Sequence, residues 1–494
     1  MSLLLGQPWS AWAIVTPMFA ATAAFLLPRQ AARVGLAAAL VVPLMVAAVV
    51  LQVHTLGSQS HVVGGWEPPL GIALRTDGLS LMLLVATALV GLVVSLYALG
   101  YFAGGVHEPQ KRRYFWPLWM FLWGACNALA VSGDLFNLYV TLEMVTLASV
   151  ALTAMGGGIA ALSAAMRYLL SGLVGSLAYL LGVALLYGAY GTVDLALLGQ
   201  VVSDDGLGRA ALALMVSGLL LKTALFPLHF WLPPAHSMAP APVSALLSAL
   251  VVKTSYLILL RLWFEVFPAV VTPAMGQLLG GLGAAAILWG SLMALRQERL
   301  KLLVAYSTVA QLGYLFLVFP LAQGEATATA WAGVVFFVLA HACGKAAMFL
   351  VAGTIYHTAG HDRIAYLAGA GGPLGVQVVV FALAAVTIIG LPPSGGFMAK
   401  WMLLNAAIVS GQWWYLVVMA LGSLLAGAYV LRVLSWAFLD VQRTFYPTLA
   451  WTLRWPPLAL ALVALLLGLV AFMPVHLALI DAPTAGPVLL EVRP

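Results

Sequence analysis

Four of the six lysines in this 494-residue chain lie inside long apolar stretches and not in polar connections. They are Lys222, Lys253, Lys345 and Lys400. A charged side chain costs several kcal/mol at the centre of a bilayer, so a lysine without a use would be expected to be replaced. The four lysines therefore indicate proton or cation handling inside a membrane, since a buried amine can take up and release a proton.

Glu143 is the acidic counterpart of these lysines, in the apolar run of residues 135–155. No residue of its own helix can pair with it, so we expect Lys222 to reach it from another helix. Such a pair can control a proton site, because the lysine keeps its proton while the carboxylate is near and yields it more readily once the carboxylate moves away. A purely structural salt bridge is the alternative.

Two further apolar runs carry basic groups that could pass protons along. Lys253 has hydroxyls nearby and no acidic residue within reach along its helix, which suits a proton carrier; a lysine that extends to the membrane surface is the alternative. His341 and Lys345 are four residues apart and therefore share a helix face. Because histidine titrates near neutral pH, the pair could form a relay, although a histidine inside a helix can also be structural.

Lys400 follows an interruption of its apolar run, the Gly- and Pro-rich stretch 390–396, and a similar break with Pro227, Pro233 and Pro234 follows Lys222. Proline removes a backbone donor and glycine frees the chain, so such breaks persist at membrane depth only where they are buried or line a wet cavity. Lys400 could exchange protons with one aqueous side or with a neighbouring subunit. Ordinary proline kinks, and a helix-end lysine that reaches the headgroups, are the alternatives.

Polar side chains that could hold a chain of water molecules occur in the same runs, although hydroxyls also serve helix packing. These candidates are Thr141, Ser244, Ser248, Thr254, Ser307, Thr308 and Gln311. His229 and His236 follow the first break, where a connecting role and a proton-uptake role fit equally well.

No other pattern indicates a chemical site. The chain has no strand followed by GxGxxG, no P-loop, no HExxH and no nucleophile elbow, and Gly156, Gly157 and Gly158 fit a flexible connection better than a phosphate cradle. Cys126 and Cys343 stand apart in apolar runs, outside any CxxC pair or metal-spaced cluster. We therefore expect no catalytic residue, no metal and no cofactor in this chain.

The composition explains why these groups are unusual: 64% of the residues are hydrophobic and 7% are charged, whereas roughly a quarter are charged in soluble domains. A helix needs about twenty apolar residues to cross a bilayer. That length predicts an all-α membrane protein of about fourteen transmembrane helices. The predicted helices cover residues 11–27, 34–53, 77–102, 114–131, 135–155, 165–190, 210–232, 242–266, 274–295, 300–320, 329–355, 376–407, 413–438 and 456–475.

The net charge of +6 comes from basic residues scattered at helix ends and inside helices, which favours membrane orientation over nucleic-acid binding. Connections after odd-numbered helices carry most of the basic residues, so both termini should face away from the cytoplasm. These residues are Arg29, Arg33, Lys111, Arg112, Arg113, Arg167, Arg296, Arg299, Lys301, Arg363, Arg443 and Arg454. The first residues lack a basic region and a cleavage site, so we expect no cleaved signal peptide.

Two breaks five helices apart are expected of inverted repeats of helices 4–8 and 9–13, with broken helices 7 and 12. The single transmembrane domain 1–494 would then contain helices 1–3 over residues 1–113, a first repeat over 114–266, a second repeat over 274–438 and helix 14 over 456–475.

Four stretches closely resemble the antiporter-like subunits of complex I, membrane-bound hydrogenases and Mrp cation/proton antiporters. They are residues 133–143, 221–233, 242–253 and 301–314. The resemblance implies fourteen helices with two inverted five-helix repeats, an ion pair of Glu143 and Lys222, a central proton site at Lys253 and a second-half site at Lys400. Some members of the family carry glutamate where Lys400 stands. Length and residue pattern resemble the Mrp D subunit most.

The connection 357–363 and the glycine-rich stretch after it differ from the usual family pattern, which leaves the subfamily open. The leading interpretation is a proton-translocating subunit of an Mrp-type Na⁺/H⁺ antiporter in a prokaryotic cell membrane. The alternative is a proton-pumping subunit of a complex I-like, hydrogenase-type or other proton-coupled uptake complex. Expected partners are other membrane subunits, protons, Na⁺ in the antiporter case and the lipid bilayer, but no nucleic acid. A stand-alone carrier and a non-conducting scaffold are further hypotheses, and any redox catalysis would belong to partner subunits.

Overall fold

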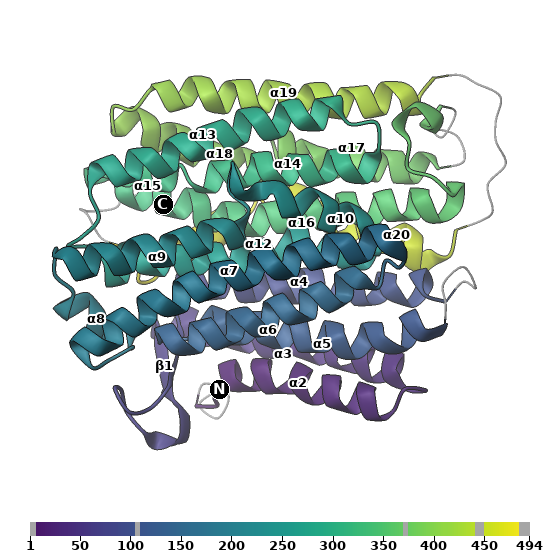
Figure 1. The fold of residues 1–494 in the computed structure, drawn as a ribbon. Coiled ribbons are helices and arrows are strands. Elements are labelled where there is room, and N and C mark those ends of the chain that lie inside the picture. Colours follow the sequence, from purple (N-terminus) through teal and green to yellow (C-terminus); the bar gives the residue numbers. More distant parts are fainter. Residues whose placement is uncertain (1–5, 104–108, 369–373, 440–448, 484–494) are drawn as a thin grey trace.

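The computed structural model describes residues 6–103, 109–368, 374–439 and 449–483 as a bundle of helices with one short hairpin (Figure 1). Arg443 and part of the glycine-rich stretch, residues 369–372, lie outside the described residues. The helices are α2 (Trp9–Leu26), α3 (Ala31–Leu56), α4 (Gly78–Tyr101), α5 (Pro109–Val131), α6 (Leu135–Ala154), α7 (Gly158–Tyr190), α8 (Leu195–Val201), α9 (Gly206–Thr223), α10 (Leu232–Met238), α11 (Ala241–Leu246), α12 (Val252–Arg261), α13 (Pro273–Arg296), α14 (Leu300–Leu315), α15 (Val318–Leu321), α16 (Thr327–Ala359), α17 (Gly375–Ile389), α18 (Gly395–Val409), α19 (Trp414–Ala437), α20 (Trp451–Leu466) and α21 (Phe472–Ala478).

Within the described part of the chain, eleven helices are long and apolar enough to cross a membrane, and three shorter apolar helices, α17, α18 and α20, accompany them. The chain is therefore a mostly helical membrane protein, as the composition predicted. Two spans lie at the centre, because the apolar windows of Ala241–Val266 and Gly324–Ala359 are 100% buried, whereas those of α2 and α3 are 33% buried. The central helix α16 packs against α4, α11, α14, α17, α18 and α20.

Both predicted breaks are present. The seventh predicted span is divided into α9, the 3₁₀ turn η2 (Leu228–Trp231) and α10, and the twelfth into α17 and α18. The residues directly after α9 and α17, Ala224 and Gly390, both have the left-handed backbone conformation. In both places the following amide, that of Leu225 or Leu391, donates back to a carbonyl five residues earlier. The breaks are therefore capped helix ends, which satisfy part of the backbone that an interrupted helix leaves unpaired.

Two features of the central span could not be read from apolar length. It contains two π-helical segments, η3 (Leu247–Val251) and η4 (Leu262–Val266), which flank α12.

The predicted helix 14, residues 456–475, is wrong in its bounds, since α20 begins at Trp451 and ends at Leu466. Two residues after this end, the chain packs closely on the second break, since a side chain at Gly468 would clash with the backbone of Pro393 and Ser394.

The connection between α3 and α4 forms an antiparallel hairpin, which the sequence analysis did not predict. Its strands are β1 (Gln59–Val62) and β2 (Ala73–Thr76), paired from Gln59 with Thr76 to Val62 with Ala73. β2 leads directly into Asp77, whose carboxylate accepts a hydrogen bond from the Ser80 amide and so caps α4. The hairpin therefore fixes where the third span begins.

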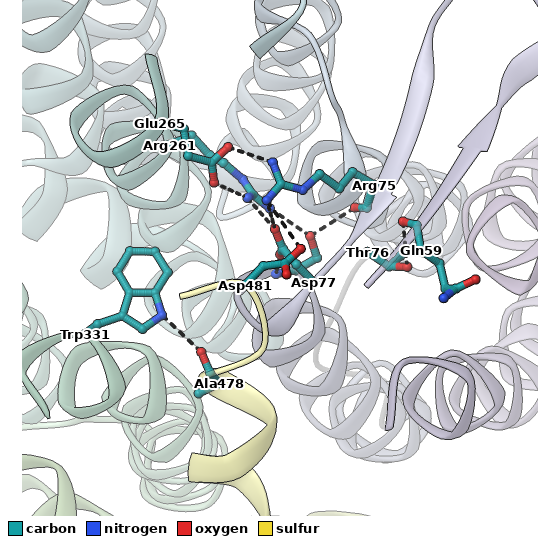
Figure 2. Close-up of polar contacts among 10 residues, drawn as sticks. Gln59, Arg75, Thr76, Asp77, Arg261, Glu265, Trp331, Ala478 and Asp481 are labelled. Carbon is teal, nitrogen blue, oxygen red and sulfur yellow. Dashed lines mark hydrogen bonds and ion pairs between the residues drawn. The ribbon is translucent and has the colours of Figure 1, made fainter. Parts of the chain in front are cut away.

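A cluster of charged side chains ties this hairpin to the central span and to the C-terminal segment (Figure 2). The fully buried Arg261 of α12 makes ion pairs with Asp77 and with Glu265, and its Nη2 lies 2.8 Å from Asp77 Oδ1. Arg75 bridges Asp77 at 3.2 Å, Glu265 at 3.0 Å and Asp481 at 3.8 Å. Burial would raise the pKa of Asp77, but the two guanidinium groups outweigh it and lower this pKa to about 2. The carboxylate therefore stays charged at physiological pH.

We expect this cluster to hold the hairpin, α4 and α12 together. Asp77→Asn keeps the helix cap but removes the negative charge, so the buried Arg261 loses one of its two carboxylate partners. The loss of one partner of a buried ion pair costs about 3–5 kcal/mol of stability. The purified variant should melt several degrees below the unmodified protein in a thermal-shift assay. Asp205→Asn, at the exposed cap of α9, is the matched control and should change little. Equal, small shifts in both variants would contradict a bracing role.

Candidate functional site

Glu143 and Lys222 form the ion pair that the sequence predicted. Lys222 lies in the last turn of α9 and Glu143 on α6, with 2.9 Å between Nζ and Oε1. The ammonium also donates to the Thr146 hydroxyl at 2.8 Å, and the Ser176 hydroxyl of α7 donates to the same carboxylate. The pair is thus held by three helices, with Lys222 more enclosed (5% of its side chain exposed) than Glu143 (17%). The two hydroxyls were not among the predicted residues.

Lys253 is buried at the centre of the protein, with 1% of its surface exposed, so it does not extend to the membrane surface. It follows the π-helical segment η3 and curls back so that Nζ donates to the Ser248 carbonyl oxygen at 2.5 Å. A second contact joins the helix of Lys253, α12, to the end of α9: the hydroxyl of Thr223, the residue after Lys222, donates to the hydroxyl of Ser255 at 2.9 Å.

Buried polar groups extend from Lys253 to Lys345 through α14 in two hydrogen-bonded sets that meet at Ser248, whose backbone carbonyl binds Lys253 and whose hydroxyl contacts Thr308. The Ser248 hydroxyl lies 2.9 Å from the Thr308 hydroxyl, which donates to the Val304 carbonyl oxygen at 3.0 Å. Lys345 Nζ donates to the same carbonyl at 3.1 Å and to the Ser307 hydroxyl. The two ammonium groups, on different spans, are therefore separated by a short series of buried hydroxyl and carbonyl groups, in which the Val304 carbonyl accepts from both Thr308 and Lys345 and has no proton to pass on.

Lys400 is held by the second break. Its Nζ donates to the carbonyl oxygens of Ile388 and Ile389 at 2.9 and 3.1 Å and to the Ser423 hydroxyl at 3.3 Å. These carbonyls belong to the last turn of α17, where a helix leaves acceptors unpaired and carries partial negative charge. The ammonium also lies 4.2 Å from the centroid of the Tyr314 ring. The break thus forms a cation site, and Lys400, 4% exposed, does not reach the headgroups.

Three buried polar side chains belong to the helices around the lysines: His341 on α16, Gln311 on α14 and His236 on α10. His341 is within electrostatic range of Lys253, Lys345 and Lys400, and His236 is within range of Lys253 and Lys345. Neither histidine has a hydrogen-bond partner for its ring nitrogens among the described residues, and the same holds for the side-chain amide of Gln311. Buried polar atoms are normally hydrogen-bonded, so these groups suit water-mediated contacts.

The other predicted water-lining hydroxyls are satisfied locally. Thr141 donates to the carbonyls of Asn137 and Leu138 in its own helix. Thr254 likewise donates to Val251, at 2.6 Å, and Ser244 donates to the two carbonyls before α11. Of the hydroxyls predicted to line water, Ser248, Ser307 and Thr308 join the connected set.

Lys301 was missed by the sequence analysis, which counted it among the orientation residues of a connection. It is the second residue of α14, 6% exposed, and its ammonium donates to the Ala239 carbonyl oxygen at the end of α10. It lies within electrostatic range of His236. The sequence feature that could have identified Lys301 is its position at the very start of an apolar run.

Comparison with known proteins gives matches over most of the chain. A family model described as NADH:quinone oxidoreductase/Mrp antiporter, TM, matches residues 132–426, and one described as NADH-Ubiquinone oxidoreductase (complex I), chain 5 N-terminus, matches residues 67–115. NADH-quinone oxidoreductase subunit N of Desulforudis audaxviator is 38% identical over 436 residues, which cover 86% of this chain and 85% of that protein. The D subunit of the Na⁺/H⁺ antiporter of Bacillus subtilis is 28% identical over 446 residues, 88% of each chain. A chain of the solved Mrp complex from Dietzia sp. is 25% identical with a TM-score of 0.86, over 96% of this chain and 97% of that one.

The contact between Glu143 and Lys222 can be tested by a double-mutant cycle. Each of Glu143→Gln and Lys222→Met leaves one buried group without its charged partner, whereas the double variant leaves neither. We expect the double variant to be more stable than the sum of the single effects predicts, with a coupling energy of about 1–3 kcal/mol. The free energies of unfolding of the purified single and double variants give this coupling energy. Additive losses would show that the two side chains do not interact.

Proposed function

Because this chain belongs to the NADH:quinone oxidoreductase/Mrp antiporter membrane family, we propose that it is the proton-translocating subunit of a multisubunit membrane complex. The observation that carries the proposal is the series of buried polar groups between Lys253 and Lys345, which are buried in different spans. Hydroxyls can donate and accept a hydrogen bond at once, so the Ser248 and Thr308 hydroxyls can pass a proton where water joins them to the two lysines.

In this mechanism the Glu143–Lys222 pair controls the first step. While the carboxylate contacts Lys222, the ammonium form is stabilised; when the two separate, the buried ammonium loses its compensation and the proton is free to move toward Lys253. The hydroxyls of Thr223 and Ser255, which are close to Lys222 and Lys253 in the sequence, lie 2.9 Å apart and bring the two helices together. Lys345 and His341 continue the path to Lys400, where the carbonyls of the second break receive the charge.

We assign fourteen spans to the chain: the eleven long apolar helices, α5, the broken pair α17–α18, and α20. Helices 4–8 and 9–13 form inverted repeats over 114–266 and 274–438, with residues 1–113 and helix 14 outside them. Two isolated bridges support this assignment. Asp134 pairs with Asp194, and Arg299 pairs with Arg363. Each joins the connection before the second helix of its repeat to the connection after the third, as internal symmetry requires.

We place the end of the bundle that holds Lys111, Arg299 and Arg363 in the cytoplasm of a prokaryotic cell, following the excess of basic residues there. The first and last described segments lie at the opposite end: the Gln52 amide donates to the Gln7 carbonyl, and the Gly78 amide to the Ile480 carbonyl. Both termini are then non-cytoplasmic.

Two coupled processes remain candidates. The residue pattern and the fold of the Dietzia Mrp chain support a role like that of the Mrp D subunit in Na⁺/H⁺ antiport. The higher identity to NADH-quinone oxidoreductase subunit N, 38% against 28% for the antiporter D subunit, favours the alternative of a proton pump driven by a redox reaction in partner subunits. In either case the proton path described above is the contribution of this chain.

The proton path predicts large losses of transport. In the intact complex, reconstituted in liposomes, Glu143→Ala and Lys253→Ala should each lower proton flux by about tenfold or more, because a proton-transfer group contributes about 10²-fold or more. Arg209→Gln, which removes an exposed basic group near the start of α9, is the control and should leave flux unchanged. Unchanged flux in both site variants, with normal assembly, would sink the proposal.

The link through α14 has a sharper test. Thr308→Val removes the hydroxyl that bridges Ser248 and Val304 without changing charge or size, so flux should fall while assembly and melting temperature hold. Thr153→Val removes an equally buried hydroxyl that donates only to its own helix at Ser149, and it should have no effect on flux. Equal fluxes in the two variants would mean that protons do not pass through this contact.

The partners decide between the two processes. Mild solubilisation from the native membrane, followed by mass spectrometry of every co-purifying subunit, should recover other membrane subunits. Small hydrophobic subunits alone indicate cation/proton antiport, whereas iron–sulfur or other soluble catalytic subunits indicate a redox-driven pump. Recovery of the chain alone, with transport activity, would contradict membership of a complex.

A further inference from the structure

A cavity of about 380 Å³ opens at the basic end of the bundle. It lies where the end of α4, the beginning of α5, the α6–α7 turn, the α10–α11 turn, the beginning of α14 and the end of α16 come together. Its lining residues include Lys111, Gly156, Gly157, Ser237, Arg299 and Lys301. None of these residues belongs to the connected set between Lys253 and Lys400.

The cavity wall carries more positive than negative charge. Lys111, Arg299 and Lys301 line it, and no aspartate or glutamate among the described residues does. Asp362 compensates Arg299, with 2.9 Å between Oδ1 and Nε. The Lys301 ammonium donates to a neutral carbonyl, and its backbone amide donates to Asp362 at 3.3 Å, so this one carboxylate faces both Arg299 and Lys301. For Lys111 no ion pair is found within the described ranges. Two cations that line the same partly enclosed cavity repel each other, and an anion bound between them would turn that repulsion into attraction.

The α6–α7 turn adds backbone donors to the same wall. α7 is 33 residues long and begins at Gly158 without a side-chain cap, so its first amides have no partner in the helix. Such a helix beginning favours anions. A side chain at Gly157 would meet the Lys111 ammonium at 3.2 Å, and Gly157 has a φ of +79°, so glycine lets the lysine approach the backbone here. The glycine run, which the sequence suggested is a flexible connection, thus forms part of a lined cavity.

We propose that this cavity binds a phosphate group between Lys111, Lys301 and the beginning of α7, either as a free anion or as the headgroup of an anionic phospholipid. Ammonium groups and helix amides are the usual ligands of phosphate oxygens. Ser237, which also lines the cavity, is next to the buried His236, so the cavity reaches the neighbourhood of the proposed proton path. A bound anion would offset the positive charge of Lys111 and Lys301 at the point where protons enter that path. That consequence rests on the proposed function, whereas the binding itself does not.

The binding is tested on the full chain in its purified native complex. Inorganic phosphate is titrated against chloride at constant ionic strength while the melting temperature is followed, and native mass spectrometry after detergent exchange detects retained phospholipid. The variants are Lys111→Gln, which is partly exposed and should fold normally, and Lys111→Gln with Lys301→Met. Arg112→Gln, which is exposed and does not line the cavity, is the matched control.

A saturable rise of the melting temperature with phosphate, with an apparent affinity that falls at least about tenfold in both variants, supports a free anion. The loss of one charged contact corresponds to a factor of this size. A phospholipid retained at one per chain, and lost from the variants but not from the control, supports the headgroup. Phosphate response and lipid content that do not depend on Lys111 and Lys301 would overturn the proposal. Because these readouts measure binding, they stay valid even if Lys253→Ala has no effect on proton flux.

Discussion

The structure depends on one constraint: a charge or a backbone polar group at membrane depth must find its partner within the protein. The lysines of this chain meet it in different ways. Lys222 has a carboxylate, while Lys253 and Lys345 have carbonyl and hydroxyl oxygens. Lys400 has the unpaired carbonyls of a helix end. Irregular segments supply the acceptors of two of these ammonium groups, the π-helical η3 for Lys253 and the second break for Lys400, whereas Lys345 uses a carbonyl and a hydroxyl of the regular helix α14.

The same constraint separates the proton path from the frame that supports it. Arg261 is as buried as the path lysines, but its charge is compensated by Asp77 and Glu265, and Arg75 adds further contacts. An arginine keeps its proton under all ordinary conditions, so this cluster holds the hairpin and α4 in place without taking part in proton exchange (Figure 2). The path lysines lack such compensation, with the exception of Lys222.

The sequence was informative where a rare residue has few physical explanations. A buried glutamate with no partner in its own helix predicted a lysine elsewhere, and two proline-containing interruptions, the second also rich in glycine, predicted helix breaks; the structure contains both. It was uninformative where the partner is a common group. The Ser248 and Val304 carbonyls, which bind Lys253 and Lys345, exist in every residue, and only the fold selects them. Lys301 and Arg261 were overlooked because their enclosure depends on neighbours distant in the sequence.

The arrangement of charges also indicates how a proton would be driven along the path. Lys253, Lys345 and Lys400 have only neutral oxygens as hydrogen-bond partners among the described residues, and the single carboxylate of the set, Glu143, lies at one end. Like charges in a poorly solvated interior repel each other, so a proton on one lysine disfavours a proton on the next. In the proposed mechanism, a change at Glu143–Lys222 would therefore alter the protonation of Lys253, and that change would in turn affect Lys345 and Lys400. One ion pair at the end of the row can thus bias proton occupancy along its whole length without any large movement of the helices.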